Sequence, residues 1–412
     1  MGASELALRL PGLVAGISLV ALTGALARAL YGTQTMLLSA ALVALAPFAV
    51  LFSGTAFPDL PMVALGLAGA LAAALDRPGW AGVWLGLSFA AKQTGVMWLP
   101  VVVWLLLQQD APRGRTFGRL ALTGALAAGV VFAWDAARTV QGAGSFWQAG
   151  VTGYGGLRLI WPQELWPRLR DWAGLARNLF GFPVVTAVAI FGLPVLAWRG
   201  VRPSGRARCG LSDLLIAAFC MVYLLLHWLW AFPVWDRYLL PLVPMLSLGL
   251  GRLLLWLASS LPWLRTRATP VLLAAVVLLL ALPGLAASRS AYPVGADHRL
   301  YGGIDHVAAF LQQLPEGAVV YQHWLGWHLA FYLFDAPVYQ AYWPTPAWLA
   351  RDVQVFGQRE PRYIVWPSWE APQRVIQALA EVGYRLKEEF AATRRDGTRS
   401  FTVYQIVPQV NP

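Results

Sequence analysis

The chain of 412 residues is 58% hydrophobic and only 12% charged, and its formal net charge is +11. Soluble domains contain about 25% charged residues, so the composition excludes an ordinary soluble protein and indicates a polytopic membrane protein. The positive excess lies in residues 1–287, which hold 20 Lys and Arg against 9 Asp and Glu, whereas residues 288–412 hold 11 of each. Because short cytoplasmic loops collect arginine, this excess does not indicate a nucleic-acid partner.

Apolar stretches before residue 288 are interpreted as about ten transmembrane helices, at roughly 20 residues each. The fourth and fifth are short, which is tolerated at membrane depth where helices line a polar cavity. The predicted spans are Leu10–Ala29, Thr35–Phe52, Pro58–Leu75, Trp80–Ala91, Val96–Leu107, Leu120–Ala137, Leu179–Trp198, Leu214–Trp230, Tyr238–Leu257 and Pro270–Ala286.

Arginine in the connecting loops predicts the orientation of these spans. The loops after the fifth, seventh and ninth spans carry clustered arginines, and we expect them in the cytoplasm. Asp59, Lys92, the segment 138–178, Asp236–Arg237 and all of 288–412 then lie on the extracytoplasmic side. This topology also places Met1 outside, which suggests that a helix precedes this chain.

Residues 288–412 have the composition of a soluble domain and are predicted to form a small extracytoplasmic α/β domain. Strands and helices alternate along it. The predicted helices are Gly303–Leu314, Trp324–Leu333, Trp348–Val355 and Ala371–Val382; the predicted strands are Ala318–Gln322, Val338–Tyr342, Tyr363–Trp366, Tyr384–Phe390 and Phe401–Val407.

Asp59 and Lys92 stand at the two ends of a pair of apolar spans joined by the turn Asp76–Gly79, so both return to one membrane face. Asp59 has two interpretations: an N-cap at a helix start, or a functional carboxylate that serves as a base or binds a sugar or metal ion. Lys92 is one of only two lysines in this arginine-rich chain. A compact ammonium suits phosphate, so we favour a phosphate ligand over a lysine that extends to water.

Arg237 and Tyr238 open the ninth span in the sequence Trp-Asp-Arg-Tyr. A guanidinium binds phosphate oxygens in a planar, bidentate way. The alternative is a simple pair between Asp236 and Arg237, which contributes less than ~1 kcal/mol if exposed. We expect Arg237 and Tyr238 to bind substrate.

The segment 138–178 combines tryptophans with interleaved arginines, which is typical of an amphipathic segment on the membrane surface. It serves either as an interfacial anchor or as a lid that guides a lipid-borne substrate, and Arg158 is its candidate ligand. Asp135, at the outer end of the sixth span, is a weaker site candidate because Arg138 is available to pair with it.

In the C-terminal domain, His323 and His328 are five residues apart, so they do not share a helix face, and metal binding is not expected. His323, at a strand end, is instead a candidate sugar contact. The sequence contains no Walker loop, nucleophile elbow or Cys-x-x-Cys motif.

Five short segments follow one another in a recognisable order: Arg9–Gly12, Ala27–Gly32, Pro58–Asp59, Leu85–Lys92 and Arg237–Pro241. Together they resemble the membrane region of integral-membrane glycosyltransferases of the protein mannosyltransferase and aminoarabinose transferase type (glycosyltransferase family 39), which have the GT-C fold. The similarity covers most of residues 5–255.

The resemblance implies a polyprenyl-phosphate-linked sugar as donor and a glycan, lipid or protein as acceptor. It implies inverting transfer on the extracytoplasmic face of a prokaryotic plasma membrane. It also implies a main catalytic acid, often an Asp-Glu pair, in a first outer loop behind a first helix. This chain begins after that point, so we expect either a start further upstream or loss of that acid.

A carboxylate, with Asp59 as the candidate, would then activate the acceptor hydroxyl while Lys92 and Arg237 hold the departing phosphate. Two cations make a metal unnecessary, although a divalent cation near Asp59 stays open. Two other functions also stay open: a transporter or flippase of lipid-linked sugars, and a catalytically inactive GT-C-like scaffold.

Overall fold

The computed structural model describes residues 4–142, 144, 145, 148, 158–201, 207–262, 267–295 and 300–409. They belong to two compact units, Glu5–Ala296 and Asp297–Pro412. Residues after the predicted division at 287 and 288 still pack with the first unit, because Tyr292 and Val294 are buried in its core. The hydroxyl of Tyr292 donates to the carbonyl of Asn178 at 2.6 Å.

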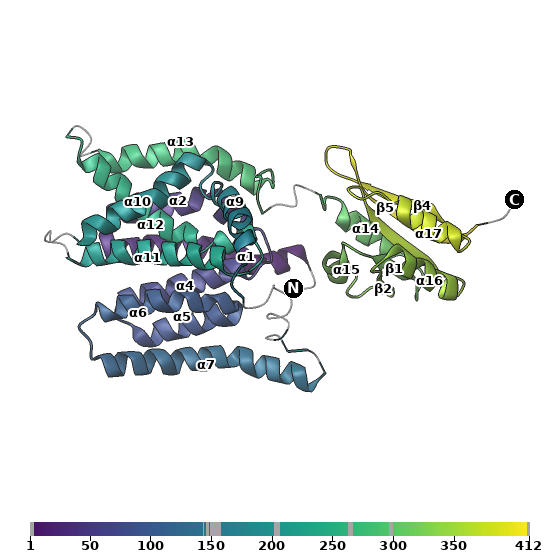
Figure 1. Cartoon of the computed structure of the whole chain (residues 1–412), viewed down its shortest axis with the longest axis horizontal. Helices are drawn as coiled ribbons and strands as arrows, with labels where there is room; N and C mark the ends of the chain where they lie inside the picture. Colours follow the sequence, from purple (N-terminus) through teal and green to yellow (C-terminus); the bar gives the residue numbers. More distant parts are fainter. Residues whose placement is uncertain are drawn as a thin grey trace. The chain divides into compact units, whose positions relative to one another are not determined.

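The first unit is a bundle of apolar helices (Figure 1), and each predicted span contains a helix. The segments are α1 Glu5–Tyr31, α2 Thr33–Leu45, α3 Pro47–Ser53, α4 Asp59–Ala74, α5 Pro78–Ala91, the 3₁₀ turn η1 Gln93–Trp98, α6 Leu99–Leu107, α7 Arg113–Val140, η2 Pro162–Glu164, α9 Leu165–Ala176, α10 Pro183–Val201, α11 Ala207–Leu229, η3 Asp236–Leu239, α12 Leu242–Ser259 and α13 Ala268–Ser288.

Within the described residues, five helices are long and apolar enough to cross a membrane, or six if α2 and α3 form one bent span. The bend between them is 57° and falls at Ala46–Pro47, where proline cannot continue the helix. The helices α4 and α10 and the pair η1–α6 are apolar but shorter. The finding supports a multi-pass protein, and the count of ten stays a prediction.

Helices α5 and α7 approach closely because small residues face each other. A Cβ atom at Gly86 would lie 2.4 Å from the carbonyl oxygen of Gly124 and 2.7 Å from Cβ of Ala127, and one at Gly82 would lie 2.4 Å from the carbonyl oxygen of Leu120. Small residues at such contacts let helix backbones pack tightly within a membrane. Figure 1 shows α7 along the edge of the bundle, beside α5.

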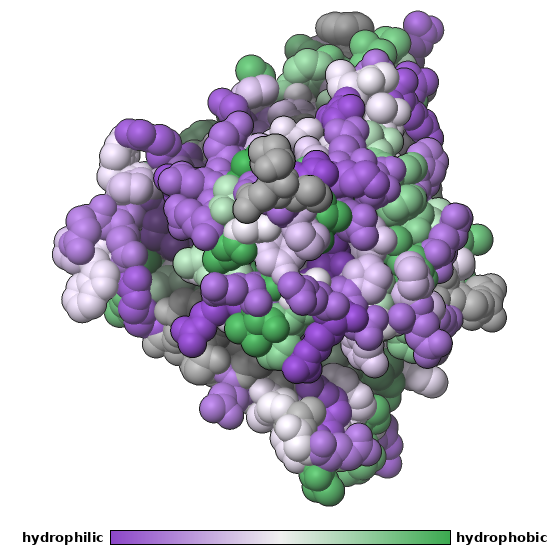
Figure 2. All heavy atoms as spheres, turned by 90° about the vertical axis from the view of Figure 1, so that its right-hand side faces the viewer, coloured by the Kyte–Doolittle hydropathy of each residue, from purple (hydrophilic) through white to green (hydrophobic). Residues whose placement is uncertain are grey.

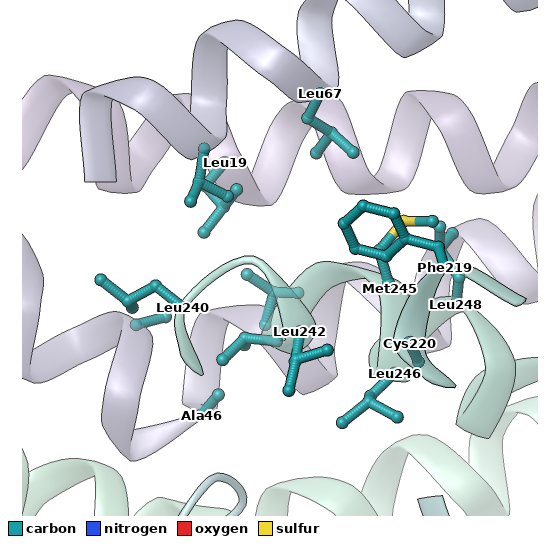
Figure 3. Close-up of a cluster of buried hydrophobic side chains, with 14 of the residues drawn as sticks. Leu19, Ala46, Leu67, Phe219, Cys220, Leu240, Leu242, Met245, Leu246 and Leu248 are labelled. Atoms are coloured by element: carbon teal, nitrogen blue, oxygen red, sulfur yellow. The ribbon is translucent and has the colours of Figure 1, made fainter. Parts of the chain in front are cut away.

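The core of the bundle includes the start of α12. Leu240 and Leu242 are fully buried, and they belong to the same cluster as Leu19 of α1 and Ala46 between α2 and α3 (Figure 3). The chain immediately after Arg237 and Tyr238 is therefore anchored among helices from the N-terminal part of the sequence.

The second unit is an α/β domain, and its elements follow the predicted order. Among residues 300–409 a five-stranded sheet has the order β2-β1-β3-β5-β4. The elements are α14 Ile304–Leu311, β1 Val319–Gln322, α15 Gly326–Tyr332, β2 Tyr339–Tyr342, α16 Pro346–Phe356, β3 Arg362–Pro367, α17 Gln373–Glu381, β4 Tyr384–Thr393 and β5 Arg399–Pro408.

Strand β1 pairs in parallel with β2 and β3, whereas β5 pairs antiparallel with β3 and β4. Successive residues of β1 enter different cores, because Val320 packs with α14 and α15 and Tyr321 packs with α16 and α17. The sheet thus lies between two helix layers. Figure 2 shows hydrophilic side chains over most of the visible surface, with smaller hydrophobic areas among them.

Candidate functional site

Asp59 is the first residue of α4 and its carboxylate is buried, with 2% of the side chain exposed. The N-cap position belongs to Pro58, and no side chain caps the helix. The N-cap interpretation of Asp59 is therefore wrong, and the carboxylate pairs instead with two cations. Its place in the first turn still agrees with the positive end of the helix dipole.

Lys92 follows α5 in an extended conformation, and its Nζ lies 2.5 Å from Oδ1 of Asp59. Only 15% of its side chain is exposed, so the ammonium is directed at a buried carboxylate and does not extend to water. Nζ also lies 4.2 Å from the centroid of the Tyr238 ring. A cation over an aromatic face is attracted by the ring quadrupole.

Two contacts fix the hairpin that brings Asp59 and Lys92 together. The hydroxyl of Ser88 on α5 donates to the carbonyl of Met62 on α4 at 2.8 Å, and Ser88 is fully buried. Beyond Lys92, the chain turns so closely that a Cβ atom at Gly95 would lie 2.5 Å from the carbonyl of Ser88. Ser88 was not among the predicted site residues, because a lone serine in an apolar helix has no distinctive pattern.

Arg237 reaches the same carboxylate from η3, with Nε 3.7 Å from Oδ2 of Asp59. Its guanidinium carbon lies 4.1 Å from the ring centroid of Trp235 and 4.5 Å from that of Phe57. The carboxylate of Asp236 accepts a hydrogen bond from the backbone N–H of Arg237 at 2.7 Å. The guanidinium thus pairs with Asp59, while Asp236 shapes the backbone of the turn.

Tyr238 links this cation pair to a buried aromatic group that the sequence analysis missed. The hydroxyl of Tyr223 donates to the carbonyl of Tyr238 at 2.7 Å. Tyr223 stacks on His227, with ring centroids 4.2 Å apart, and His227 lies edge-on to Tyr238 at 5.8 Å. Tyr223 and His227 lie one turn apart on α11, a spacing that is visible in the sequence but is not specific to a site.

Arg158 and Asp135 have other partners in the first unit. Arg158 forms a bidentate pair with Glu164 at 2.8 and 2.9 Å. This guanidinium, with the backbone N–H of Trp161, lowers the pKa of Glu164 to about 2. Asp135 lies 3.8 Å from Arg138 and accepts a hydrogen bond from Ser145 at 3.0 Å. Residues 149–157, which include the glycine-rich part of the segment 138–178, lie outside the described residues.

His323 lies in the second unit, at the end of β1. Its Nδ1 is 2.7 Å from the carbonyl oxygen of Trp343, and its ring packs against Trp324, Tyr342 and Trp343. Its predicted role as a sugar contact stays a prediction.

The described residues contain no group of three His, Cys, Asp or Glu side chains that would hold a metal ion. A divalent cation at Asp59 would lie close to the ammonium of Lys92 and the guanidinium of Arg237, which repel it and already occupy the carboxylate oxygens that it would need as ligands. The geometry instead suits an anion that takes the place of the carboxylate between Lys92 and Arg237.

The fold and this site define a multi-pass helical membrane protein with two cations held around one buried acid. A family model described as dolichyl-phosphate-mannose-protein mannosyltransferase matches residues 1–134. No curated protein matches the chain.

Solved structures with this fold include ArnT from Cupriavidus metallidurans in the apo state, at 15% identity, a TM-score of 0.64, and coverage of 96% of this chain and 83% of that one. ArnT bound to undecaprenyl phosphate matches at 14% identity and a TM-score of 0.61, over 97% and 83% of the two chains. The apo oligosaccharyltransferase of Archaeoglobus fulgidus matches at 12% identity and a TM-score of 0.54, over 96% and 63%.

The match to the family model and the shared fold agree with the resemblance to the protein mannosyltransferase and aminoarabinose transferase type that the sequence motifs indicated. The likeness to the solved structures is one of fold, and the match to the family model covers the part of the chain that carries Asp59 and Lys92.

Proposed function

We propose that this protein is a membrane glycosyltransferase that takes a sugar from a polyprenyl-phosphate donor. One observation carries the proposal: Lys92 and Arg237, from segments far apart in the sequence, converge on the buried carboxylate of Asp59. Charged side chains within a membrane protein are costly and mark functional sites. Two cations that share one anion form a site that a phosphate would fill.

The chemistry of the two cations favours a phosphate over a carboxylate ligand. A phosphate group carries more charge and more acceptor oxygens than Asp59, so it binds the ammonium of Lys92 and the guanidinium of Arg237 together. ArnT, which shares the fold, has a solved structure with undecaprenyl phosphate bound. The proposed donor for this chain is a sugar on a lipid phosphate of that class.

In the proposed reaction, the acceptor hydroxyl oxygen bonds to the anomeric carbon while the bond from this carbon to the phosphate oxygen breaks. The electron pair of that bond leaves on the phosphate, where Lys92 and Arg237 stabilise the charge. The hydroxyl proton goes to a carboxylate base. Asp59 is the candidate base, because its carboxylate oxygens become available to accept a proton once the phosphate binds Lys92 and Arg237 in its place.

The predicted topology indicates on which side of the membrane the transfer takes place. The arginine-rich loops favour a cytoplasmic location for the opposite end of the bundle. We therefore propose that transfer takes place on the extracytoplasmic face of a prokaryotic plasma membrane, with the α/β unit on the same side. The acceptor would be a glycan, a lipid or a protein.

The test uses the full chain in lipid nanodiscs with radiolabelled undecaprenyl-phosphate sugars, hexoses and pentoses in turn, and acceptor-containing membranes. Transfer of label and release of undecaprenyl phosphate support the enzyme. Lys92→Ala and Arg237→Ala should abolish both while the protein remains folded. In proteoliposomes, movement of the labelled donor across the bilayer without cleavage of its sugar–phosphate bond would indicate a flippase. If both variants still bind the donor and transfer its sugar as the wild type does, the phosphate site is refuted.

A further inference from the structure

One arginine in the amphipathic helix α9 organises the backbone just before the cation site. The guanidinium of Arg168 is partly buried and donates to four carbonyl oxygens of one short segment. The acceptors are the carbonyls of His227 at 3.0 Å, Trp228 at 3.2 Å, Trp230 at 2.7 Å and Phe232 at 2.8 Å.

These carbonyls lie where α11 ends, at Leu229, and in the turn that follows. The last four carbonyls of a helix have no partner within the helix, and an unpaired polar group away from water is unfavourable. Arg168, from another part of the chain, supplies a donor for two of them, the carbonyls of His227 and Trp228. Its replacement would remove a side-chain donor from these two carbonyls and from those of Trp230 and Phe232 in the turn.

Two tryptophans reinforce the same connection. The indole N–H of Trp172 donates to the carbonyl of His227 at 2.9 Å, and the indole N–H of Trp228 donates to the carbonyl of Leu165 at 2.9 Å. Helix α9 packs against both α11 and η3. Helix α9 is therefore more than a membrane-surface anchor, because its side chains also form hydrogen bonds with the end of α11.

The supported turn leads directly to the site, because Arg237 follows Phe232 by only five positions. After Arg237, the chain is held by the hydrogen bond from the Tyr223 hydroxyl to the carbonyl of Tyr238 and by the buried side chain of Leu240. The backbone that carries Arg237 is thus fixed at both ends, and Arg168 makes the largest number of side-chain hydrogen bonds at its beginning.

We propose that Arg168 is a positioning residue for Arg237, and this inference rests on the proposed binding of a lipid phosphate by Arg237. Arg168 acts through the backbone from His227 to Phe232 and does not itself bind the phosphate. Its loss would let Arg237 move relative to Asp59 and Lys92. Phosphate binding would weaken although all three charged groups remain present.

The first measurement is the binding of undecaprenyl phosphate to the full chain in nanodiscs. We expect Arg168→Ala to weaken binding by about tenfold to a hundredfold, as when a reactive group is displaced by about 1 Å. Arg168→Lys should recover little, because one ammonium does not span four carbonyls. Arg170→Ala is the matched control, since Arg170 lies on the same helix and is exposed.

A double-mutant cycle separates positioning from a general loss of structure. In an Arg237→Ala background, Arg168→Ala should add little, because the group that it positions is already absent. An equal loss in both backgrounds would overturn the inference. If Arg237→Ala alone leaves binding unchanged, the proposed function fails, and this outcome differs from a failure of Arg168.

Hydrogen exchange gives a readout that needs no ligand. The backbone amides of Trp235, Tyr238 and Leu240 are hydrogen-bonded within the turn. Arg168→Ala and Arg168→Lys should accelerate their exchange, and Arg170→Ala should not. Unchanged exchange in both Arg168 variants would also overturn the inference.

Discussion

The ammonium of Lys92 and the carboxylate of Asp59 form the closest ion pair of the site, with 2.5 Å between Nζ and Oδ1. The two residues are the ends of one helical hairpin, so the pair closes the hairpin at the end where Arg237 approaches. In the chain without ligand, Asp59 is the counter-ion of both cations. Any anionic substrate must compete with it.

Replacement of this counter-ion should change binding and transfer in opposite directions. In Asp59→Asn the cations lose a competing anion, so undecaprenyl phosphate should bind more tightly by roughly tenfold, given ~1.5–3 kcal/mol for charged hydrogen bonds. Sugar transfer should fall, because the candidate base is absent. Titration calorimetry and the radiolabel assay measure the two effects. Weaker binding in Asp59→Asn would contradict the competition, and Asp135→Asn is the control.

The pair should also contribute to stability. Asp59→Asn leaves two buried cations near each other, and loss of one partner from a buried pair costs about 3–5 kcal/mol. The melting temperature in detergent should fall, and Asp59→Asn with Lys92→Met should recover part of it. The exposed pair of Glu5 and Arg9 is the control, since Glu5→Gln should have a small effect. Additive effects of the two site substitutions would argue against coupling.

The face of the Tyr238 ring should contribute to phosphate binding, because it holds the ammonium of Lys92. Tyr238→Phe keeps the ring beneath the Lys92 ammonium, whereas Tyr238→Leu removes an attraction of about 0.5–2 kcal/mol. We expect Tyr238→Leu to weaken undecaprenyl phosphate binding several-fold and to exceed the effect of Tyr238→Phe. Equal losses in the two variants would assign the contribution to the hydroxyl group.

The close contact between α5 and α7 predicts a sharp difference between two glycines. Gly86→Ala places a Cβ atom 2.4 Å from the carbonyl oxygen of Gly124, so the helices must separate and the folded yield should drop. Gly129→Ala on α7 meets open space and should be neutral or slightly stabilising. Size-exclusion chromatography and thermal unfolding compare them, and equal yields would contradict the close packing.

The pair of Arg158 and Glu164 predicts an acid-dependent effect outside the membrane. Because the guanidinium lowers the pKa of Glu164 to about 2 from an ordinary value of 4.5, the pair stabilises the folded state above pH 4.5. This contribution is lost as the pH falls towards 2. The melting temperatures of the wild type and Glu164→Gln should therefore differ at pH 6 and converge only as the pH falls below about 2. A difference that persists at low pH would exclude this pair as its source, and high salt should reduce it.

Much of the molecule was predictable from the sequence because the signals are local. Apolar runs predicted a helix at each proposed span, and alternating patterns predicted every helix and strand of the C-terminal unit in order. The hairpin between Asp59 and Lys92 also followed from local features, since two spans and a tight turn return their ends to one face. Arg237 was a candidate because it opens an apolar span and a guanidinium binds phosphate oxygens in a planar, bidentate way.

The tertiary structure alone decided which charges meet. Arg237 pairs with Asp59 and not with its neighbour Asp236, while Arg158 pairs with Glu164 away from the site. Arg168 supports the end of α11, although its sequence context is that of a membrane-surface arginine. Composition and periodicity depend on neighbouring residues, but these contacts join segments far apart in the chain. They depend on how the buried helices pack, which no local pattern specifies.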